Sequence, residues 1–395
     1  MCCNIETLSH IGDTAYVNGI NQPIDPFDPF RNPTQETDYT PDYTEIVPQI
    51  RIPGCRLPLT PSKREKTAIR RYFTLAGLLA FFDFAFAALI ANVLFMAAIF
   101  LLRLIDAHAL EGELPGNYMQ IAQQYLSDSS VEMASNLLGF FISNVTVFFL
   151  GCKLTRVRPM SFFQDRDITL PSVLRYCVLG LFIQFGAGYG VDYIGSLLRE
   201  DNPLFSAPDM TMGDSPTKLL VTILYTCLIA PITEELVFRG VFLKNMSRVS
   251  QRFGIFTSAL FFALAHQNVP QGVLAFFLGI LLGYITIKHN SLVPGMIVHF
   301  TVNVTSMLFT RLGEIAPNSA DKLFTLVTVI VCVLGMIMLI YTLSTERLPD
   351  DTPFQKIRCA PLAWTSWGLW LAAFLHVGMM ALTTLMNRFT EAFTG

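Results

Sequence analysis

Two adjacent glutamates, Glu234 and Glu235, stand inside a strongly apolar run of the chain. Neighbouring side chains on a helix point about 100° apart, so the two carboxylates cannot share one role. Glu235 precedes Arg239 by four residues, with the acid first, which is the favoured geometry of a helical ion pair. That pair would keep Glu235 ionised and anchored, and it leaves Glu234 available as a general base. A purely structural charge cluster that locks helices together is the alternative.

Two histidines on later apolar segments add to this pattern. Phe262 and His266 are four residues apart, as are His299 and Asn303, so each pair lies on one helical face. Counted from predicted helix ends on the same side, Glu234, His266 and His299 lie roughly 12 to 18 Å deep. The three side chains can therefore meet in one cavity, which we expect to open toward the cytoplasm.

A carboxylate, two imidazoles and an amide at one depth suit water-mediated hydrolysis. The base removes a proton from water, and hydrogen-bond donors stabilise the oxyanion of the tetrahedral intermediate. Ionisable groups inside apolar spans are energetically costly and usually face an internal cavity. The sequence therefore predicts a hydrolytic site within a bundle of membrane-spanning helices.

The composition of the chain independently predicts a membrane protein. Of its 395 residues, 52% are hydrophobic and only 14% are charged, and the mean hydropathy is +0.48. A soluble domain carries about 25% charged residues. The net charge of −3 offers no basic surface for a nucleic acid. The eight cysteines form no CxxC pair, so neither a disulfide framework nor a cysteine-based zinc site is expected.

Long apolar segments divide the chain into three parts. Residues 1–71 hold nine of the 22 prolines and are predicted to form an irregular cytoplasmic tail. Residues 72–345 are predicted to form an all-α polytopic transmembrane bundle, with a catalytic core at about 172–343. Residues 346–395 would supply a linker and one more helix. About eight to nine spans of bilayer-crossing length are expected, at 73–104, 134–152, 173–198, 217–243, 254–268, 271–287, 292–310, 323–344 and 363–386.

Basic residues alternate between the loops, and this alternation predicts the orientation of the bundle. Lysines and arginines gather before the first span, between the second and third, and after the fourth, whereas the intervening loops carry acids. The N-terminus and the opening of the site are therefore predicted to be cytoplasmic, in a cell membrane that we expect to be bacterial. The last helix is apolar enough to cross and end outside, but Trp364, Trp367 and Trp370 would also suit an interfacial helix.

Three ordered motifs resemble those of the CAAX protease and bacteriocin-processing (CPBP, or Abi) superfamily, which includes the type II CAAX prenyl endopeptidases. They are Glu234-Glu235-x-x-x-Arg239, Phe262-x-x-x-His266 and His299-x-x-x-Asn303. The resemblance covers about residues 172–343, and its specific part lies between residues 231 and 303. It implies a helical bundle and an intramembrane endopeptidase whose site is on the cytoplasmic side.

The resemblance also implies a role for each motif residue. Glu234 with His266 would activate the water, while His299 and Asn303 would hold the oxyanion. The remaining motif residues would support this site or line its cavity: Glu235, Arg239 and Phe262.

The sequence leaves the use of a metal and the class of function open. Zinc can bind two histidines and a glutamate, here Glu234, His266 and His299. No HExxH-type pairing occurs, and the resemblance favours a glutamate mechanism without metal or other cofactor. The expected partners are the lipid bilayer and a peptide or membrane-protein substrate. The alternative is a non-catalytic bacteriocin-immunity or peptide-binding membrane protein. A transporter is disfavoured, because no repeat relates the halves of the chain.

Other ionisable residues have no motif partner. Asp83 and Asp192 lie within predicted spans, and we expect them to make interhelical hydrogen bonds. The remaining histidines are interpreted as loop or incidental core residues: His10, His108, His289 and His376.

Overall fold

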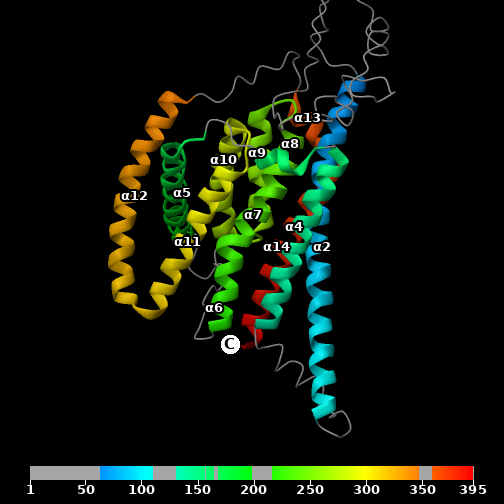
Figure 1. Cartoon of the computed structure of the whole chain (residues 1–395), viewed down its shortest axis with the longest axis vertical. Coiled ribbons are helices and arrows are strands. Elements are labelled where there is room, and N and C mark those ends of the chain that lie inside the picture. The colour runs from blue at the N-terminus through cyan, green and yellow to red at the C-terminus, as the bar shows by residue number, and fades with distance from the viewer. Residues whose placement is uncertain are drawn as a thin grey trace, which may run out of the picture.

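The computed structural model describes residues 63–109, 130–155, 157–163, 168–197, 216–346 and 358–394. Within these ranges every regular element is a helix, and eight helices are long and apolar enough to cross a membrane. The predicted all-α polytopic bundle is thereby confirmed (Figure 1). Residues 1–62, which make up most of the predicted tail, lie outside the described ranges, as does His10.

Seven of the apolar segments are long continuous helices. They are α2 (Lys63–Ala109), α4 (Ser130–Thr155), α5 (Leu170–Leu197), α10 (Val269–His289), α11 (Val293–Ile315), α12 (Pro317–Thr345) and α14 (Trp367–Thr394). Shorter elements join them: η2 (Pro159–Phe163), α9 (Gln251–Ala265) and α13 (Cys359–Trp364). The fourth predicted span is a series of pieces: α6 (Pro216–Ile223), the π-helical η4 (Leu224–Ile229), α7 (Ala230–Glu235), the π-helical η5 (Leu236–Phe242) and α8 (Leu243–Met246).

Two groups of helices enclose the segment that carries the glutamates. On one side α2 packs against both α4 and α14, and on the other α5 packs against α10, α11 and α12 (Figure 1). Between the two groups, η5 contacts α2, α4, α9 and α10. The largest cluster of buried apolar side chains lies around η5 and includes Phe73, Phe242 and Phe262. The fold therefore places α7 and η5 at its centre, where their polar side chains are withdrawn from lipid.

The last helix is attached to the bundle through glycines. A Cβ on Gly77 of α2 would lie 2.3 Å from the carbonyl carbon of Gly368 in α14, and a Cβ on Gly368 would lie 2.3 Å from the carbonyl oxygen of Thr74. Only glycine allows two backbones to come this close, and such contacts are common between helices in membranes. Helix α14 thus packs along α2, and it is one of the eight candidate spans.

The first helix begins earlier than predicted. Residues 63–71, expected to belong to the irregular tail, form the first turns of α2. This stretch is rich in basic residues but contains no proline or glycine, and lysine and arginine favour helix. Ile69 packs into the core from these turns with 3% of its surface exposed. The basic residues before position 72 therefore did not show where the helix begins.

The segment predicted as a fifth span is too short to cross the bilayer by itself. Helix α9 has 15 residues, which is about 22 Å, whereas the hydrocarbon layer is about 30 Å thick. The chain then turns at Gln267, whose φ of 56° lies in the left-handed region, and α10 returns beside α9. The two helices form a hairpin that starts and finishes at the same end of the bundle (Figure 1).

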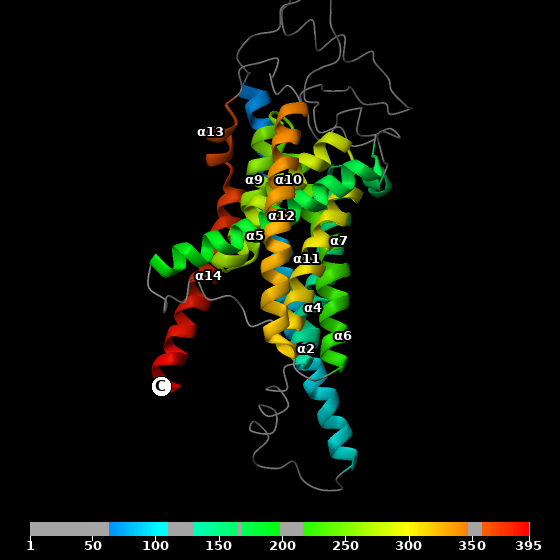
Figure 2. The same cartoon turned by 90° about the vertical axis from the view of Figure 1, so that its left-hand side faces the viewer.

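Helix α5 runs obliquely across the other helices rather than alongside them (Figure 2). Its last turns extend beyond its neighbours, since a Cβ on Gly186, Gly188 or Gly190 would meet no atom within 4 Å. Asp192 on these turns is exposed and has no hydrogen bond to any residue in the described ranges. The interhelical hydrogen bond predicted for Asp192 is therefore wrong, because no helix in the described ranges covers this part of α5.

Candidate active site

The four residues predicted to be catalytic line one cavity of about 320 Å³: Glu234, His266, His299 and Asn303. The cavity lies among η4, α7, α9, α10 and α11, and Phe262 also contributes to its wall. These five helical elements thus bring the three motifs to a single place inside the bundle.

The predicted ion pair between Glu235 and Arg239 is present behind the cavity. Arg239 Nη1 lies 2.8 Å from Glu235 Oε1, and both side chains are fully buried. Two glycines on neighbouring helices make room for this pair. A Cβ on Gly295 would lie 3.4 Å from Glu235 Oε2, and a Cβ on Gly279 would lie 3.2 Å from Arg239 Nη2. The pair is held between helices and cannot reach solvent.

Glu234 lies on a different face of the helix from Glu235. Its side chain keeps 24% of its surface exposed, and it lines the cavity. His299 connects the two carboxylates, since its Nδ1 lies 3.1 Å from Glu235 Oε1 and its Nε2 lies 3.8 Å from Glu234 Oε2. An ionised carboxylate only accepts hydrogen bonds, so Nδ1–H of His299 donates to Glu235. In neutral His299 the Nε2 lone pair is then on the side of Glu234.

His266 stands at the tip of the α9–α10 hairpin, where α9 ends. Its Nδ1 lies 2.8 Å from the carbonyl oxygen of Phe262. A carbonyl accepts only, so Nδ1 carries the proton and Nε2 of neutral His266 is an acceptor. The turn is fixed by Asn268, whose amide donates to the His266 carbonyl at 2.8 Å. The same side chain caps α10 by accepting from the backbone N–H of Gln271 at 2.8 Å.

Phe262 does more than line the cavity. Its ring lies edge-on to His266, at 4.9 Å between centroids, and to His299, at 5.7 Å. The guanidinium carbon of Arg239 lies 4.1 Å from the centroid of the same ring. Phe262 therefore contacts Arg239 and both histidines at once and limits how these groups can move relative to one another.

A proline and a wide helical turn fix the position of Asn303. In η4 the N–H of Ala230 donates to the carbonyl of Tyr225, five residues earlier. By the same spacing the carbonyl of Thr226 would need a donor at Pro231, which has no N–H. The side-chain amide of Asn303 supplies that donor at 2.8 Å. One N–H of the Asn303 amide thereby donates to Thr226, and the second N–H takes no part in this hydrogen bond.

The lining of the cavity continues from the cluster toward one end of the bundle. Beyond the cluster it continues along Tyr225 and Thr226 and along Ser306 and Thr310. These residues lie toward the end of the bundle where α6 begins and α11 ends (Figure 1). The opening toward the cytoplasm stays a prediction, and the basic residues on which it rests gather at the other end, near α8 and α10. There, large side chains that follow Glu234 in the chain fill the space, among them the buried Phe238.

Some of these lining residues were not predicted from the sequence. Ser306 and Thr310 follow His299 by seven and eleven residues, which is one helical face, so the periodicity could have identified them. Tyr225 precedes Glu234 by nine residues, or about two and a half turns, so a regular helix would place it on the opposite face. The wider turns of η4 shift that register, and no feature of the sequence indicates these π-helical turns.

A buried polar chain approaches Glu234 from the outer helices. Ser143 Oγ donates to Asp83 Oδ1 at 2.9 Å, which is the interhelical hydrogen bond predicted for Asp83. With its amide oriented to satisfy both neighbours, Asn144 donates to Asp83 at 3.1 Å and accepts from Thr233 Oγ1 at 3.0 Å. These hydrogen bonds link α2, α4 and α7 directly beside Glu234.

The two histidines in other described parts of the chain do not contribute to this cavity. His376 is a core residue as predicted, since its Nδ1 lies 2.8 Å from the carbonyl of Ala372 and its ring packs on Phe84. His289 is more than incidental, because its Nε2 lies 3.2 Å from the hydroxyl of Tyr176 in a separate polar cluster. The side chain of His108 lies outside the described residues.

The sequence left open a zinc site at Glu234, His266 and His299. Among the described residues, no group of three His, Cys, Asp or Glu side chains could hold a metal ion. The candidate zinc set of Glu234, His266 and His299 shares a cavity without converging on one point.

Comparison with known protein families agrees with the three motifs. Residues 216–305 match the family model described as Type II CAAX prenyl endopeptidase Rce1-like, a stretch that runs from α6 into α11 and contains every predicted site residue. No protein of curated function and no solved structure matches the chain. Residues 216–305 are thus similar to the Rce1-like family of CAAX-type endopeptidases, as the motifs predict.

Proposed function

We propose that the protein is an intramembrane endopeptidase that hydrolyses peptide bonds with water activated by Glu234 and His266. The observation that carries this proposal is the shared cavity of Glu234, His266, His299 and Asn303 inside the bundle. The family match supports protease activity, because the Rce1-like family is a family of endopeptidases.

Glu234 is the proposed general base because it is the carboxylate that remains available. Glu235 is committed to Arg239 and His299, whereas Glu234 has its carboxylate at the cavity surface. Nε2 of His266 is an acceptor, so a water molecule between Glu234 and His266 can donate both of its protons. Such a water directs a lone pair toward a substrate carbonyl, which is the orientation that nucleophilic attack requires.

His299 and Asn303 are the proposed donors to the oxyanion. The second N–H of Asn303 is a donor held in place by the bond from its first N–H to Thr226. His299 becomes a donor at Nε2 when that nitrogen is protonated, and the Glu235 carboxylate at Nδ1 stabilises the resulting imidazolium. Fixed donors of this kind each contribute about 10²- to 10³-fold to the rate of acyl transfer.

The proposed reaction balances its protons through Glu234. Water gives a proton to the carboxylate, and the hydroxide adds to the peptide carbonyl carbon. As the C–N bond breaks, the proton on Glu234 passes to the leaving nitrogen, which departs as the amine. No metal is part of this proposal.

The substrate is proposed to be a peptide or a membrane-associated protein. The matched family is described as one of CAAX prenyl endopeptidases, so a prenylated C-terminal peptide is the first substrate to test. The purified full-length chain would be incubated with that peptide and with an unbiased peptide pool, and products would be identified by mass spectrometry. Each reaction would be run with and without a strong chelator.

Glu234→Gln is the decisive variant, and Glu314→Gln is its matched control. Glu314 pairs with Arg311 on α11 and does not line the cavity. Its variant therefore makes the same Glu-to-Gln change outside the proposed site. We expect Glu234→Gln to lower kcat by at least about 10²-fold, as loss of a general base does, while Glu314→Gln and the chelator leave cleavage unchanged. Cleavage lost with chelator would support a zinc enzyme instead. A folded wild-type protein that cuts none of the peptides would favour the non-catalytic peptide-binding role.

A further inference from the structure

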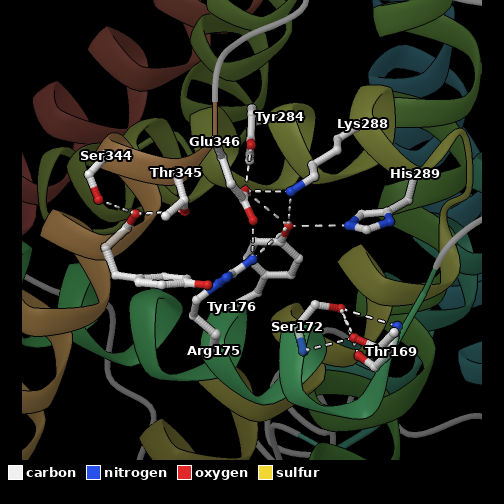
Figure 3. A network of polar contacts seen from close by, with 11 residues as sticks. Thr169, Ser172, Arg175, Tyr176, Tyr284, Lys288, His289, Ser344, Thr345 and Glu346 are labelled. Carbon is white, nitrogen blue, oxygen red and sulfur yellow. Dashed lines mark hydrogen bonds and ion pairs between the residues drawn. The ribbon is translucent and has the colours of Figure 1, made fainter.

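A second polar cluster lies where α5 begins and where α10 and α12 end (Figure 3). Its central residue is Glu346, which directly follows α12. The other members come from α5 and α10: Arg175, Tyr176, Tyr284, Lys288 and His289. None of them lines the catalytic cavity, so this cluster is a separate site.

The Glu346 carboxylate is surrounded by donors. It accepts from Lys288 Nζ at 2.5 Å and from the Tyr284 hydroxyl at 2.6 Å, and it forms an ion pair with Arg175. The Tyr176 hydroxyl lies 3.3 Å away. Burial by itself raises the pKa of Glu346, but these hydrogen bonds and positive charges together hold it below its ordinary value. The carboxylate is therefore ionised at neutral pH.

Beside this carboxylate lies a cavity of about 680 Å³. Arg175, Lys288 and His289 form its basic side, and Met338 and Tyr341 of α12 form its more apolar side. The cavity therefore combines positive charge with a surface suited to hydrocarbon.

The cavity wall has more capacity for an anion than Glu346 uses. Two cations, Arg175 and Lys288, face this one carboxylate. The guanidinium of Arg175 is held between aromatic rings, 5.1 Å from the centroid of Tyr176 and 5.2 Å from that of Tyr341. Its buried Nε–H has no acceptor among the described residues. A guanidinium with an unused donor matches the bidentate geometry of phosphate.

The cluster also lies at the level of a membrane surface. The candidate span of α5 starts at Leu170, that of α10 ends at His289 and that of α12 ends at Thr345. Each of the three helices contributes one tyrosine here, and tyrosines are enriched where a membrane meets water. Basic pockets between membrane helices at this level bind the head groups of anionic lipids.

We propose that this cavity binds the phosphate group of an anionic membrane lipid, with Arg175 and Lys288 as its cationic contacts and Glu346 as a competing internal anion. A zwitterionic lipid binds less well, because its positive head group meets the same two cations. Soluble phosphate shares the anionic chemistry but has no hydrocarbon to place against Met338. The proposal is independent of whether the protein cuts peptides.

The experiment titrates the full-length protein in a neutral detergent with three probes: phosphatidylglycerol, phosphatidylcholine and inorganic phosphate. Native mass spectrometry measures bound lipid, and thermal unfolding measures stabilisation by each probe. We expect phosphatidylglycerol to bind and phosphatidylcholine to bind more weakly. Lys288→Gln should weaken phosphatidylglycerol binding about fivefold, as loss of one basic contact near a membrane does. Glu346→Gln should strengthen it, because the internal competitor loses its charge.

Lys288 carries the test because it is the most exposed cation of the cluster, at 30%, so its variant is the least demanding for folding. Lys288→Arg should restore binding, and Lys322→Gln, at an exposed lysine near the start of α12, should leave it unchanged. A purely structural cluster would instead show no gain of phosphatidylglycerol affinity in Glu346→Gln, which overturns the proposal. Equal stabilisation by inorganic phosphate would support the anion site and assign it a soluble ligand.

Discussion

Replacing Arg239 with methionine tests whether the buried ion pair supports the site as the geometry indicates. Methionine keeps an unbranched apolar stem like that of arginine but removes the guanidinium and its charge. Glu235 would then remain fully buried, and His299 would be its one remaining ion-pair or hydrogen-bond partner among the described residues. The variant thus isolates the cost of an uncompensated buried carboxylate.

The expected loss of unfolding free energy follows from the burial of both partners. Removing one member of a fully buried ion pair costs about 3–5 kcal/mol. Arg239→Met also removes the cation over Phe262, which adds about 0.5–2 kcal/mol. In the double variant Glu235→Gln/Arg239→Met no buried charge is left alone, so its loss should be smaller than the sum of the two single losses. We expect a coupling free energy of about 2–3 kcal/mol.

The measurement is a double-mutant cycle on reversible unfolding in mixed micelles. The partly exposed ion pair Arg311–Glu314 supplies the control cycle, with Arg311→Met and Glu314→Gln. Its side chains are 29% and 19% exposed, and such pairs contribute only about 0–1 kcal/mol. If the free-energy losses at Glu235 and Arg239 simply add, the two residues do not act as the proposed unit and the reasoning is refuted.

Three further predictions address other parts of the fold. Pro231→Ala restores an N–H that can bond within the helix and release Asn303, so kcat should fall while KM and the melting temperature change little, as steady-state kinetics and thermal unfolding would show. Gly368→Ala should lower the melting temperature by forcing α14 away from α2, whereas Gly378→Ala, where a Cβ meets nothing within 4 Å, should not. Because the pKa of Glu346 is lowered in the folded protein, its stabilising effect is present above about pH 4.3, the ordinary value for a glutamate, and is lost as pH falls below that. Glu346→Gln should therefore flatten the loss of melting temperature on acidification, and an unchanged acid profile would contradict this assignment.

Contacts within one helix could be predicted from the sequence. The Glu235–Arg239 pair depends only on a spacing of four residues, and the structure contains it. Apolar length likewise predicted most of the spans, because a bilayer imposes a nearly constant length on the helices that cross it. The three motifs on successive segments were enough to identify the residues that share the cavity.

Contacts between helices and departures from regular helix could not be predicted in this way. Glu346 and Arg175 are 171 residues apart, and nothing in either segment indicates the other. Tyr225 reaches the cavity only because η4 changes the helical register. Asp192 lies in an apolar segment, where a polar side chain is usually buried. Burial depends, however, on whether a neighbouring helix covers that turn, and none of the described helices does.

The short length of α9 has a consequence for how the protein is made. When α9 has left the ribosome it is a helix of 15 residues, too short to be a stable span by itself. It must wait for α10, so the hairpin enters the bilayer as a unit. His266 gains its place only after Asn268 has capped the next helix. Biosynthesis therefore completes the proposed catalytic cavity late, after α11 has followed.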